Sequence, residues 1–485
     1  MTLLLAGYFY ILAALVVGLM LRQYARGTHD LLSLRNVALA GFVVFQLTSA
    51  AQVMRARYMG AFTLHDPVQT GLAYAVWSTT FLVVFLVAYA WGPGVKRLAA
   101  KPNPSRTDVT DRTLRLFAII CLFSGAFFMV LPIPLVSLVT SKVGFGLMAI
   151  AAGLGGWMWA RRPTALETIL PSFTVLAAAL ASSMIIGFGR RPLIAVVGCF
   201  IFAAYFSRWR YLPPKAVIQR LAAVAIPAVL AVALFTSARG GLRDTGAGPV
   251  AQIKAVVTAN PVEGLSMLAD GQGAAAKSMW LMEQFPEQYE YRPFSTLLYA
   301  FYFPVPRSWW NDKPTTLSMD LPQLARVQRV NRDVLTLGPG AIGHAAVDGG
   351  FLVLIIYAVL AALGLRLADE IIVRHATQPL VVLPVACALG QVLGLSRGEA
   401  GVFASILAIS IIGAWIYIAF VSKLLVRLGL VVSDAVAPFQ IDDYRAEYDF
   451  EYYGSPEFDP DPPAVLPLEV QRIMRGESEP GRRAA

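Results

Sequence analysis

The stretch that decides the fold is residues 299–350, YAFYFPVPRSWWNDKPTTLSMDLPQLARVQRVNRDVLTLGPGAIGHAAVDGG. It forms the latter part of the only long polar interruption in an otherwise hydrophobic chain. Between Pro304 and Pro314 it combines prolines, tryptophans and cations. Proline breaks the hydrogen-bond ladder of a helix and charge is costly in lipid, so these residues suit neither a regular helix nor a membrane span. The composition predicts a binding loop with an aromatic surface, set between groups of membrane helices.

The rest of the chain has the composition of a polytopic membrane protein. Of its 485 residues, 57% are hydrophobic and only 14% are charged. That is far more apolar surface than one soluble core can bury. Apolar runs that approach or reach the length of a bilayer span lie at residues 3–21, 36–54, 70–91, 116–138, 143–160, 164–187, 193–206, 217–235, 351–365, 380–395 and 402–421. We therefore expect an all-α fold with about 11 transmembrane helices.

This pattern divides the chain into four parts. We expect a first bundle of about eight helices in residues 1–238, a large extracytoplasmic loop in 239–350 and about three more helices in 351–425. Residues 426–485 contain many prolines and acidic residues, which predicts a disordered cytoplasmic tail. The loops on one side of the predicted bundle carry seventeen Lys and Arg residues and those on the other side carry six. The positive side is expected to face the cytoplasm, which places the N-terminus outside and the C-terminus inside.

Composition also excludes several kinds of site. All three cysteines lie in apolar runs, which argues against a disulfide framework: Cys121, Cys199 and Cys387. No two of the four histidines have metal-ligand spacing, so we expect no metal site and no cofactor. The net charge of +10 comes from basic residues between the spans, so we interpret it as a topology signal and expect no nucleic-acid partner.

Arginines stand beside glycine at the outer ends of three predicted spans. Arg190 and Arg191 lie in IIGFGRRPL, Arg239 in TSARGGLR and Arg397 in GLSRGEAG. We call these three segments the Gly-Arg corners. Arginine offers a planar fork of donors to phosphate oxygens, and glycine lets backbone N–H groups approach an anion. The corners predict a site for the diphosphate of a lipid-linked substrate; the alternative is that each arginine reaches the membrane interface and pairs with lipid headgroups.

Residues 303–314, which we call the aromatic loop, form a second candidate group. Arg307 and Lys313 flank Trp309 and Trp310. An indole face stacks on a sugar ring while cations hold phosphate or carboxylate, so the loop predicts binding of a glycan. The alternative is an interfacial belt, in which the two tryptophans only mark the depth of the lipid headgroups.

Proton transfer requires a group that titrates near neutral pH, and His344 in GPGAIGHAAVDGG is the first candidate. Carboxylate alternatives are Glu399, Asp270, Glu283 and Asp348, and we also place Asp348 among the substrate-binding residues. A single histidine beside a span is often a hydrogen-bonded structural residue instead.

Three of these segments resemble the oligosaccharide repeat-unit polymerases, the Wzy-type O-antigen polymerases of bacterial inner membranes. The resemblance is carried by YAFYFPVPRSWWNDKP, by GPGAIGHAAVDGG leading into a span and by the corner IIGFGRRPL. A large external loop late in a chain of many spans is similar too. Where many members of that family have Gly-Glu before the span, this chain has Gly343 and His344.

The resemblance implies a metal-independent, inverting glycosyltransferase. Such an enzyme polymerises undecaprenyl-diphosphate-linked repeat units into O-antigen, capsule or exopolysaccharide on the outer face of the inner membrane. It implies that the arginines of the Gly-Arg corners stabilise charge on the departing diphosphate, that the aromatic loop orients the glycans and that His344 or a nearby carboxylate takes the acceptor proton. The implied partners are the lipid-linked oligosaccharide, membrane lipid, a chain-length regulator and a flippase.

Three other functions remain open at this point. An O-antigen ligase uses the same carrier and differs in its acceptor. A transporter of polysaccharide or lipid-linked sugar needs ionisable residues and broken helices near the bilayer midplane, whereas the predicted spans are nearly free of charge. A scaffold for polysaccharide export would leave the Gly-Arg corners unexplained.

Overall fold

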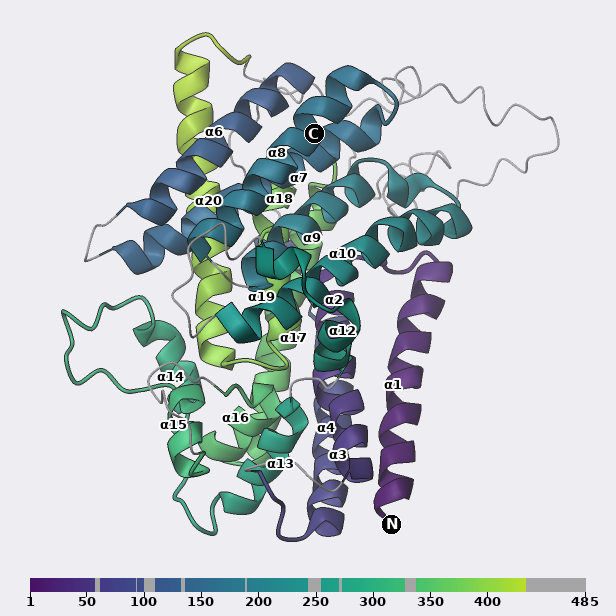
Figure 1. Cartoon of the computed structure of the whole chain (residues 1–485), viewed down its shortest axis with the longest axis vertical. Coiled ribbons are helices and arrows are strands. Elements are labelled where there is room, and N and C mark those ends of the chain that lie inside the picture. The colour runs from purple at the N-terminus through teal and green to yellow at the C-terminus, as the bar shows by residue number, and fades with distance from the viewer. Residues whose placement is uncertain are drawn as a thin grey trace, which may run out of the picture.

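In the computed structural model, the described residues form helices and connecting loops (Figure 1). The structure describes residues 1–56, 62–92, 94–99, 110–131, 136–187, 190–242, 254–269, 273–327 and 337–432. Within these ranges, the side chains of 184–187, 190–191, 239–242 and 267–269 are not described. The helices before the large loop are α1 (Thr2–Ala25), α2 (Leu34–Phe42), η1 (Val43–Thr48), α3 (Ser49–Ala56), α4 (Pro67–Ala90), α5 (Val95–Ala99), α6 (Asp111–Val130), α7 (Ser137–Arg161), α8 (Leu166–Gly187), α9 (Arg190–Ser207), η2 (Trp209–Tyr211) and α10 (Pro214–Leu242). The helices within the large loop are α12 (Pro261–Ala269), α13 (Ala274–Gln284), α14 (Ser295–Tyr302), α15 (Leu317–Leu324) and α16 (Gly340–Asp348). The helices after it are α17 (Phe351–Arg374), α18 (Pro379–Ala386), α19 (Leu389–Gly394) and α20 (Ala400–Arg427).

Nine of the described helices are long and apolar enough to cross a membrane. Two further apolar helices, Pro192–Ser207 and Pro379–Gly394, are shorter. These elements occupy the eleven predicted runs, and the chain is all-helical in its described part, with the architecture of a polytopic membrane protein. Several predicted boundaries differ from the structure, the largest by nine residues, because α17 continues to Arg374, past the predicted end at 365. The fourth run ends at Val130, eight residues before its predicted end at 138, and α10 continues to Leu242 inside the predicted loop.

The long helices lie in two orientations. Helices α1, α4, α17 and α20 run along the long axis of the molecule, and α6, α7 and α8 cross it obliquely (Figure 1). The short helices α13, α14, α15 and α16 gather at the end where α1 begins, which we call the loop end. The large polar loop therefore folds into a helical layer at one end of the bundle.

Glycines allow α7 to pack closely against its neighbours. A Cβ on Gly144 would lie 2.7 Å from the carbonyl oxygen of Gly125 in α6. A Cβ on Gly155 would lie 3.0 Å from the carbonyl oxygen of Ser172 in α8. Small residues at such contacts let helix backbones approach in lipid, where packing has to replace the hydrophobic effect. Helix α7 is accordingly buried along most of its length.

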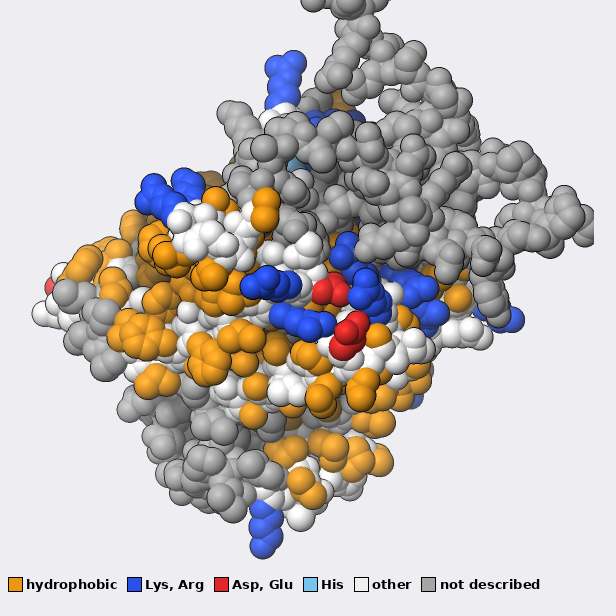
Figure 2. Space-filling view, turned by 90° about the horizontal axis from the view of Figure 1, so that it is seen from above, with side chains coloured by type: hydrophobic (Ala, Val, Ile, Leu, Met, Phe, Trp, Pro, Cys, Tyr) orange, Lys and Arg blue, Asp and Glu red, His pale blue; other side chains and the backbone are white. Residues whose placement is uncertain are grey.

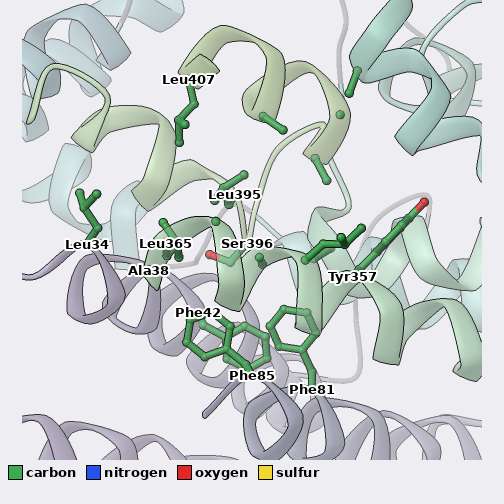
Figure 3. Close-up of a pocket in the computed structure, with 18 of the residues that line it drawn as sticks. Leu34, Ala38, Phe42, Phe81, Phe85, Tyr357, Leu365, Leu395, Ser396 and Leu407 are labelled. Carbon is green, nitrogen blue, oxygen red and sulfur yellow. The ribbon is translucent and has the colours of Figure 1, made fainter. Parts of the chain in front are cut away.

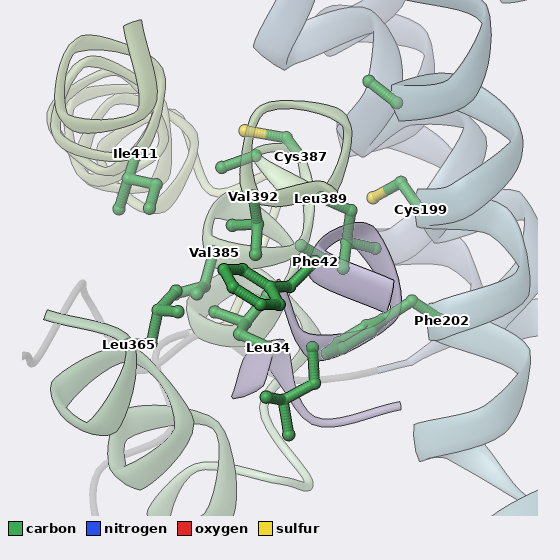
Figure 4. Close-up of a cluster of buried hydrophobic side chains, with 14 of the residues drawn as sticks. Leu34, Phe42, Cys199, Phe202, Leu365, Val385, Cys387, Leu389, Val392 and Ile411 are labelled. Atoms are coloured by element: carbon green, nitrogen blue, oxygen red, sulfur yellow. The ribbon is translucent and has the colours of Figure 1, made fainter. Parts of the chain in front are cut away.

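A buried apolar cluster joins the two sets of helices. Side chains from α2, α9, α17, α18, α19 and α20 meet in it, including Leu34, Phe42, Phe202, Leu365, Val385 and Ile411 (Figure 4). Cys199 and Cys387 also point into this region (Figure 4). Together with Cys121 they are buried and unpaired, as their apolar surroundings in the sequence indicated.

At the end opposite the loop end, Asp369 of α17 holds the start of α2. Its carboxylate accepts hydrogen bonds from the backbone N–H groups of Leu34, at 2.6 Å, and Arg35, at 3.0 Å. The hydroxyl of Tyr89 in α4 donates to the same carboxylate at 2.7 Å. The first N–H groups of a helix have no hydrogen-bond partner within the helix. This one carboxylate accepts from those of α2 and also joins α2, α4 and α17.

Basic side chains gather at this same end of the molecule. Seen from above, Lys and Arg form a group beside many hydrophobic side chains (Figure 2). Helices α1, α17 and α20 each have a basic residue in the last turn: Arg22, Arg374 and Arg427. Cations are favourable at helix C-termini, and positive charge is enriched on one side of membrane proteins.

Replacing Asp369 tests the joint between the spans. We expect Asp369→Asn to lower the free energy of unfolding by about 2 kcal/mol, because two buried N–H groups lose a charged acceptor. The matched control is the neighbouring Glu370→Gln, which affects only ion pairs with Arg366 and Arg374 on the same helix and should cost less than about 1 kcal/mol. Unfolding of purified protein in detergent measures both, and equal effects would contradict the assigned role of Asp369.

Candidate functional site

The second span contains a π-helical turn, η1, that fastens it to two other segments. Such turns reorient side chains and are frequent at functional sites. The side-chain amide of Gln46 donates to the carbonyl oxygens of Ser396 and Pro339, the latter at 3.4 Å. Its amide oxygen accepts from the hydroxyl of Tyr74. The turn thus holds the chain before α20 and the chain before α16 side by side at the loop end.

Two cations, Lys277 and Arg397, lie around the point that Gln46 fastens. Lys277 belongs to α13 and is only 9% exposed. The hydroxyl of the next residue, Ser278, donates to the carbonyl oxygen of Pro339 at 2.5 Å, which fixes α13 against the same turn. The guanidinium carbon of Arg397 lies 5.5 Å from the ring centre of Phe45, a cation–π contact.

The surroundings of Lys277 disfavour its charge. Burial and, second, the positive charge of Arg397 lower the pKa of Lys277 to about 8. Loss of hydration and repulsion by a second cation both disfavour a charged ammonium group. An anion bound between the two side chains would offset both effects, so the arrangement is suited to phosphate or diphosphate.

Glycines near Arg397 allow two backbone segments, the turn before α16 and the chain before α20, to pack closely. A Cβ on Gly338 would lie 2.7 Å from the carbonyl oxygen of Arg397. Gly340 has a φ of +75°, which favours glycine, and its N–H donates to the carbonyl oxygen of Gly398 at 3.1 Å. Gly338 and Gly340 thus have a structural role that the sequence did not indicate, whereas the approach of the corner glycines to an anion stays a prediction.

His344 is enclosed beneath this region and has no exposed surface. Its Nδ1 lies 2.8 Å from the hydroxyl of Thr296, and its Nε2 lies 3.5 Å from a carboxylate oxygen of Glu399. Glu399 also accepts from the backbone N–H of Ser318 at 2.9 Å and from its hydroxyl at 2.5 Å. These contacts join α14, α15, α16 and the start of α20. That His344 takes an acceptor proton stays a prediction.

Asp348 lies at the end of α16 and is buried as well. Its carboxylate accepts from the hydroxyl of Ser295 at 2.6 Å, from the backbone N–H of Thr296 at 3.1 Å and from the hydroxyl of Tyr357. Ser295 and Thr296 are the first residues of α14, so Asp348 supplies the acceptor that this helix start needs. The predicted contact between Asp348 and substrate stays a prediction.

Within the aromatic loop, the two cations bind backbone. The ammonium group of Lys313 is buried and donates to the carbonyl oxygens of Phe303, at 3.1 Å, and Val305, at 2.8 Å. Arg307 donates to the carbonyl oxygen of Lys313 at 3.2 Å. These bonds close the loop after α14, which makes Lys313 a structural residue in this conformation.

The two tryptophans of the loop differ in exposure. Trp310 packs edge-on against Tyr302, with ring centres 5.1 Å apart. Trp309 is 64% exposed. Of the two tryptophans, Trp309 therefore has the larger exposed surface for contact with a sugar ring or with lipid.

Other predicted residues lie outside the described part of the structure. This holds for the side chains of Arg190 and Arg191, at the start of α9, and of Arg239 in α10. Asp270 lies outside it as well. That the three Gly-Arg corners converge stays a prediction, because only the corner with Arg397 has a described side chain.

Glu283, the remaining carboxylate alternative, holds α13 against the start of α4. It accepts from the backbone N–H of His65 at 2.8 Å and from that of Asp66 at 3.2 Å. The hydroxyl of Thr70 also donates to it. Across the described ranges, no group of three or more His, Cys, Asp or Glu side chains is placed to hold a metal ion.

Lys277, Gln46 and Thr296 were not among the residues that the sequence singled out. A signal for Lys277 was present, because it is the only charged residue in AAAKSMWLM, residues 274–282. A lone charge among small and apolar residues indicates that the charged side chain is buried. A buried cation has a functional role more often than a cation on the surface does. Gln46 and Thr296 carried no comparable signal.

Lys277 should destabilise the folded protein near neutral pH. Below a pH of about 8, both the folded and the unfolded chain carry its charge, and the folded state bears the cost of burial. Between the folded pKa of about 8 and the ordinary value of 10.5, only the unfolded chain keeps the proton, so the free energy of unfolding rises with pH. We expect the free energy of unfolding of wild type to rise by up to about 3 kcal/mol between pH 7 and the ordinary lysine pKa, a rise that Lys277→Met should lack. Unfolding of both proteins in detergent as a function of pH checks this, and the same pH dependence in both would contradict it.

Comparison with protein-family models, curated proteins and solved structures gave no match. Similarity therefore assigns no family to the chain. The chemistry of the site has to be inferred from Lys277, Arg397 and the residues that position them.

Proposed function

We propose that the protein is a membrane glycosyltransferase that binds a lipid-linked diphosphate at Lys277 and Arg397. In this proposal it polymerises oligosaccharide repeat units into a surface polysaccharide. The observation that supports it best is the placement of two neighbouring cations, one of them largely buried, on separate elements joined at Pro339. Cations held in advance at a departing diphosphate stabilise the charge that develops as it leaves.

The proposed reaction breaks the bond between the anomeric carbon of the growing glycan and its diphosphate carrier. The diphosphate leaves with the electron pair, and a hydroxyl of the next lipid-linked unit bonds to the anomeric carbon with inversion. The proton of that hydroxyl passes to a base, for which the enclosed pair of His344 and Glu399 is a candidate after a conformational change. In the described conformation we assign this pair to positioning, because Glu399 lies two residues after Arg397 and fixes it relative to α16.

The remaining sequence hypotheses fit around this centre. Arg190, Arg191 and Arg239 add further positive charge if the corners meet. Trp309 offers an exposed ring to the glycan. All eleven apolar segments cross a bacterial inner membrane in this proposal, the loop end faces outward and the basic end faces the cytoplasm. A chain-length regulator and a flippase are the protein partners that such an activity needs.

Chain growth on a lipid-diphosphate-linked repeat unit tests the proposal. Purified wild type should give a ladder of glycan lengths on a gel. Lys277→Met and Arg397→Ala should reduce the ladder by at least about 100-fold, because each removes charge at the leaving group. The matched control is Lys423→Met, which removes an exposed cation near the opposite end of α20 and should leave the ladder unchanged. Transfer of one unit to a different acceptor would favour the ligase, and tight binding without turnover would favour a transporter or scaffold.

The titration of Lys277 supplies a second test. Raising the pH from 7 to 9 should weaken binding of inorganic diphosphate to wild type by up to about tenfold, because Lys277 loses its proton above a pKa of about 8. Lys277→Arg keeps its charge over this range and should bind with little change. The same decline in both proteins would show that a group other than Lys277 titrates.

A further inference from the structure

An apolar chamber of about 280 Å³ opens between α2, α4, α14, α17 and α20 (Figure 3). Few of the residues that line it are polar; those with a side-chain hydroxyl are Thr296, Tyr357 and Ser396. The backbone N–H of Thr296 and the hydroxyl of Tyr357 donate to Asp348, as described above, and Ser396 directly precedes Arg397. The wall of the chamber is therefore continuous with the segments that form the candidate site.

Small residues and stacked rings leave the chamber open. Small residues on α14, α16, α17 and α20 line it: Ala300, Ala341, Ala361, Gly364, Ala368 and Ala404. A Cβ on Gly364 would have no heavy atom within 4 Å, so this glycine faces open space. Three rings also line the chamber: Phe42 and Phe81 stack with ring centres 5.2 Å apart, and Phe81 and Phe85 with ring centres 6.3 Å apart (Figure 3).

The chamber is elongated along the spans. On α17 its lining extends from Tyr357 to Ala368, and on α20 from Ala400 to Ile411. Each of these stretches is about 17 Å of helix at about 1.5 Å per residue. Leu360 and Gly364 line the chamber and are exposed, so the chamber is open beside them. A long apolar space with a lateral opening fits a flexible hydrocarbon chain better than a compact ligand.

We propose that the chamber binds the head-proximal part of the single hydrocarbon chain of the lipid-linked substrate. This inference rests on the proposed function, because it places the diphosphate of the same molecule at Lys277 and Arg397. Burial of the chain supplies binding energy away from the reacting atoms and holds the diphosphate in register with the two cations. A membrane phospholipid has similar hydrocarbon chemistry, and competition with it distinguishes the two sources.

Filling the chamber tests this proposal. In Gly364→Leu the new side chain enters open space, so the helix should remain in place. Affinities of the full-length protein for undecaprenyl diphosphate and for inorganic diphosphate are measured in detergent. Gly364→Leu should weaken binding of the lipid by at least about tenfold and leave inorganic diphosphate unaffected. The matched control is Gly18→Leu, at an exposed glycine of α1 that also has no heavy atom within 4 Å and does not line the chamber; it should change neither affinity.

Unchanged lipid affinity in Gly364→Leu, with intact binding of inorganic diphosphate, would overturn the chamber assignment and leave the proposed function standing. Failure of wild type to bind either compound would instead remove the proposed function. Should Gly364→Leu lose both affinities through misfolding, a lipid diphosphate with a photoreactive group on the first part of its chain decides the matter in wild type. Labelling of α4 and α17 would support the chamber, whereas labelling elsewhere, or displacement by phosphatidylglycerol, would overturn it.

Discussion

The turn at Pro339 and Gly340 is the contact on which the candidate site depends. The carbonyl oxygen of Pro339 accepts from Ser278 and Gln46, and the N–H of Gly340 donates to Gly398. These bonds bring α13, the second span and the start of α20 to one point. Lys277 and Arg397 are neighbours because each is adjacent in sequence to a residue that this turn, or Gln46 beside it, holds: Lys277 precedes Ser278, and Arg397 follows Ser396.

Buried polar groups join the helices at both ends of the molecule, and they do so by different means. At the loop end, Asp348 and Glu399 accept from hydroxyl and backbone donors of short loop helices. At the opposite end, Asp369 accepts from the first N–H groups of a span. Hydrophobic contact distinguishes little between one packing and another in lipid, so directional bonds of this kind define which helices meet. The carboxylates singled out by the sequence belong largely to this framework.

The sequence predicted the membrane helices well because apolar length is a local property that one run of residues carries by itself. It did not predict the π-helical turn at η1, since VVFQLT has the composition of any apolar span. It identified His344 and Asp348 as ionisable residues near a site, but their roles depend on Thr296, about fifty residues earlier. Lys313 shows the same limit: its cationic side chain predicted ligand binding, and only the folded loop shows that backbone carbonyls take its donors.

The segment Pro379–Gly394 has a consequence for the depth of Arg397 in the protein. Its 16 residues reach about 24 Å as helix, less than the roughly 30 Å of bilayer hydrocarbon. Neighbouring helices bury the segment along most of its length, so protein and not lipid surrounds it. Arg397 follows three residues after Gly394, so the length of this short segment sets how deep in the helix bundle its charge lies.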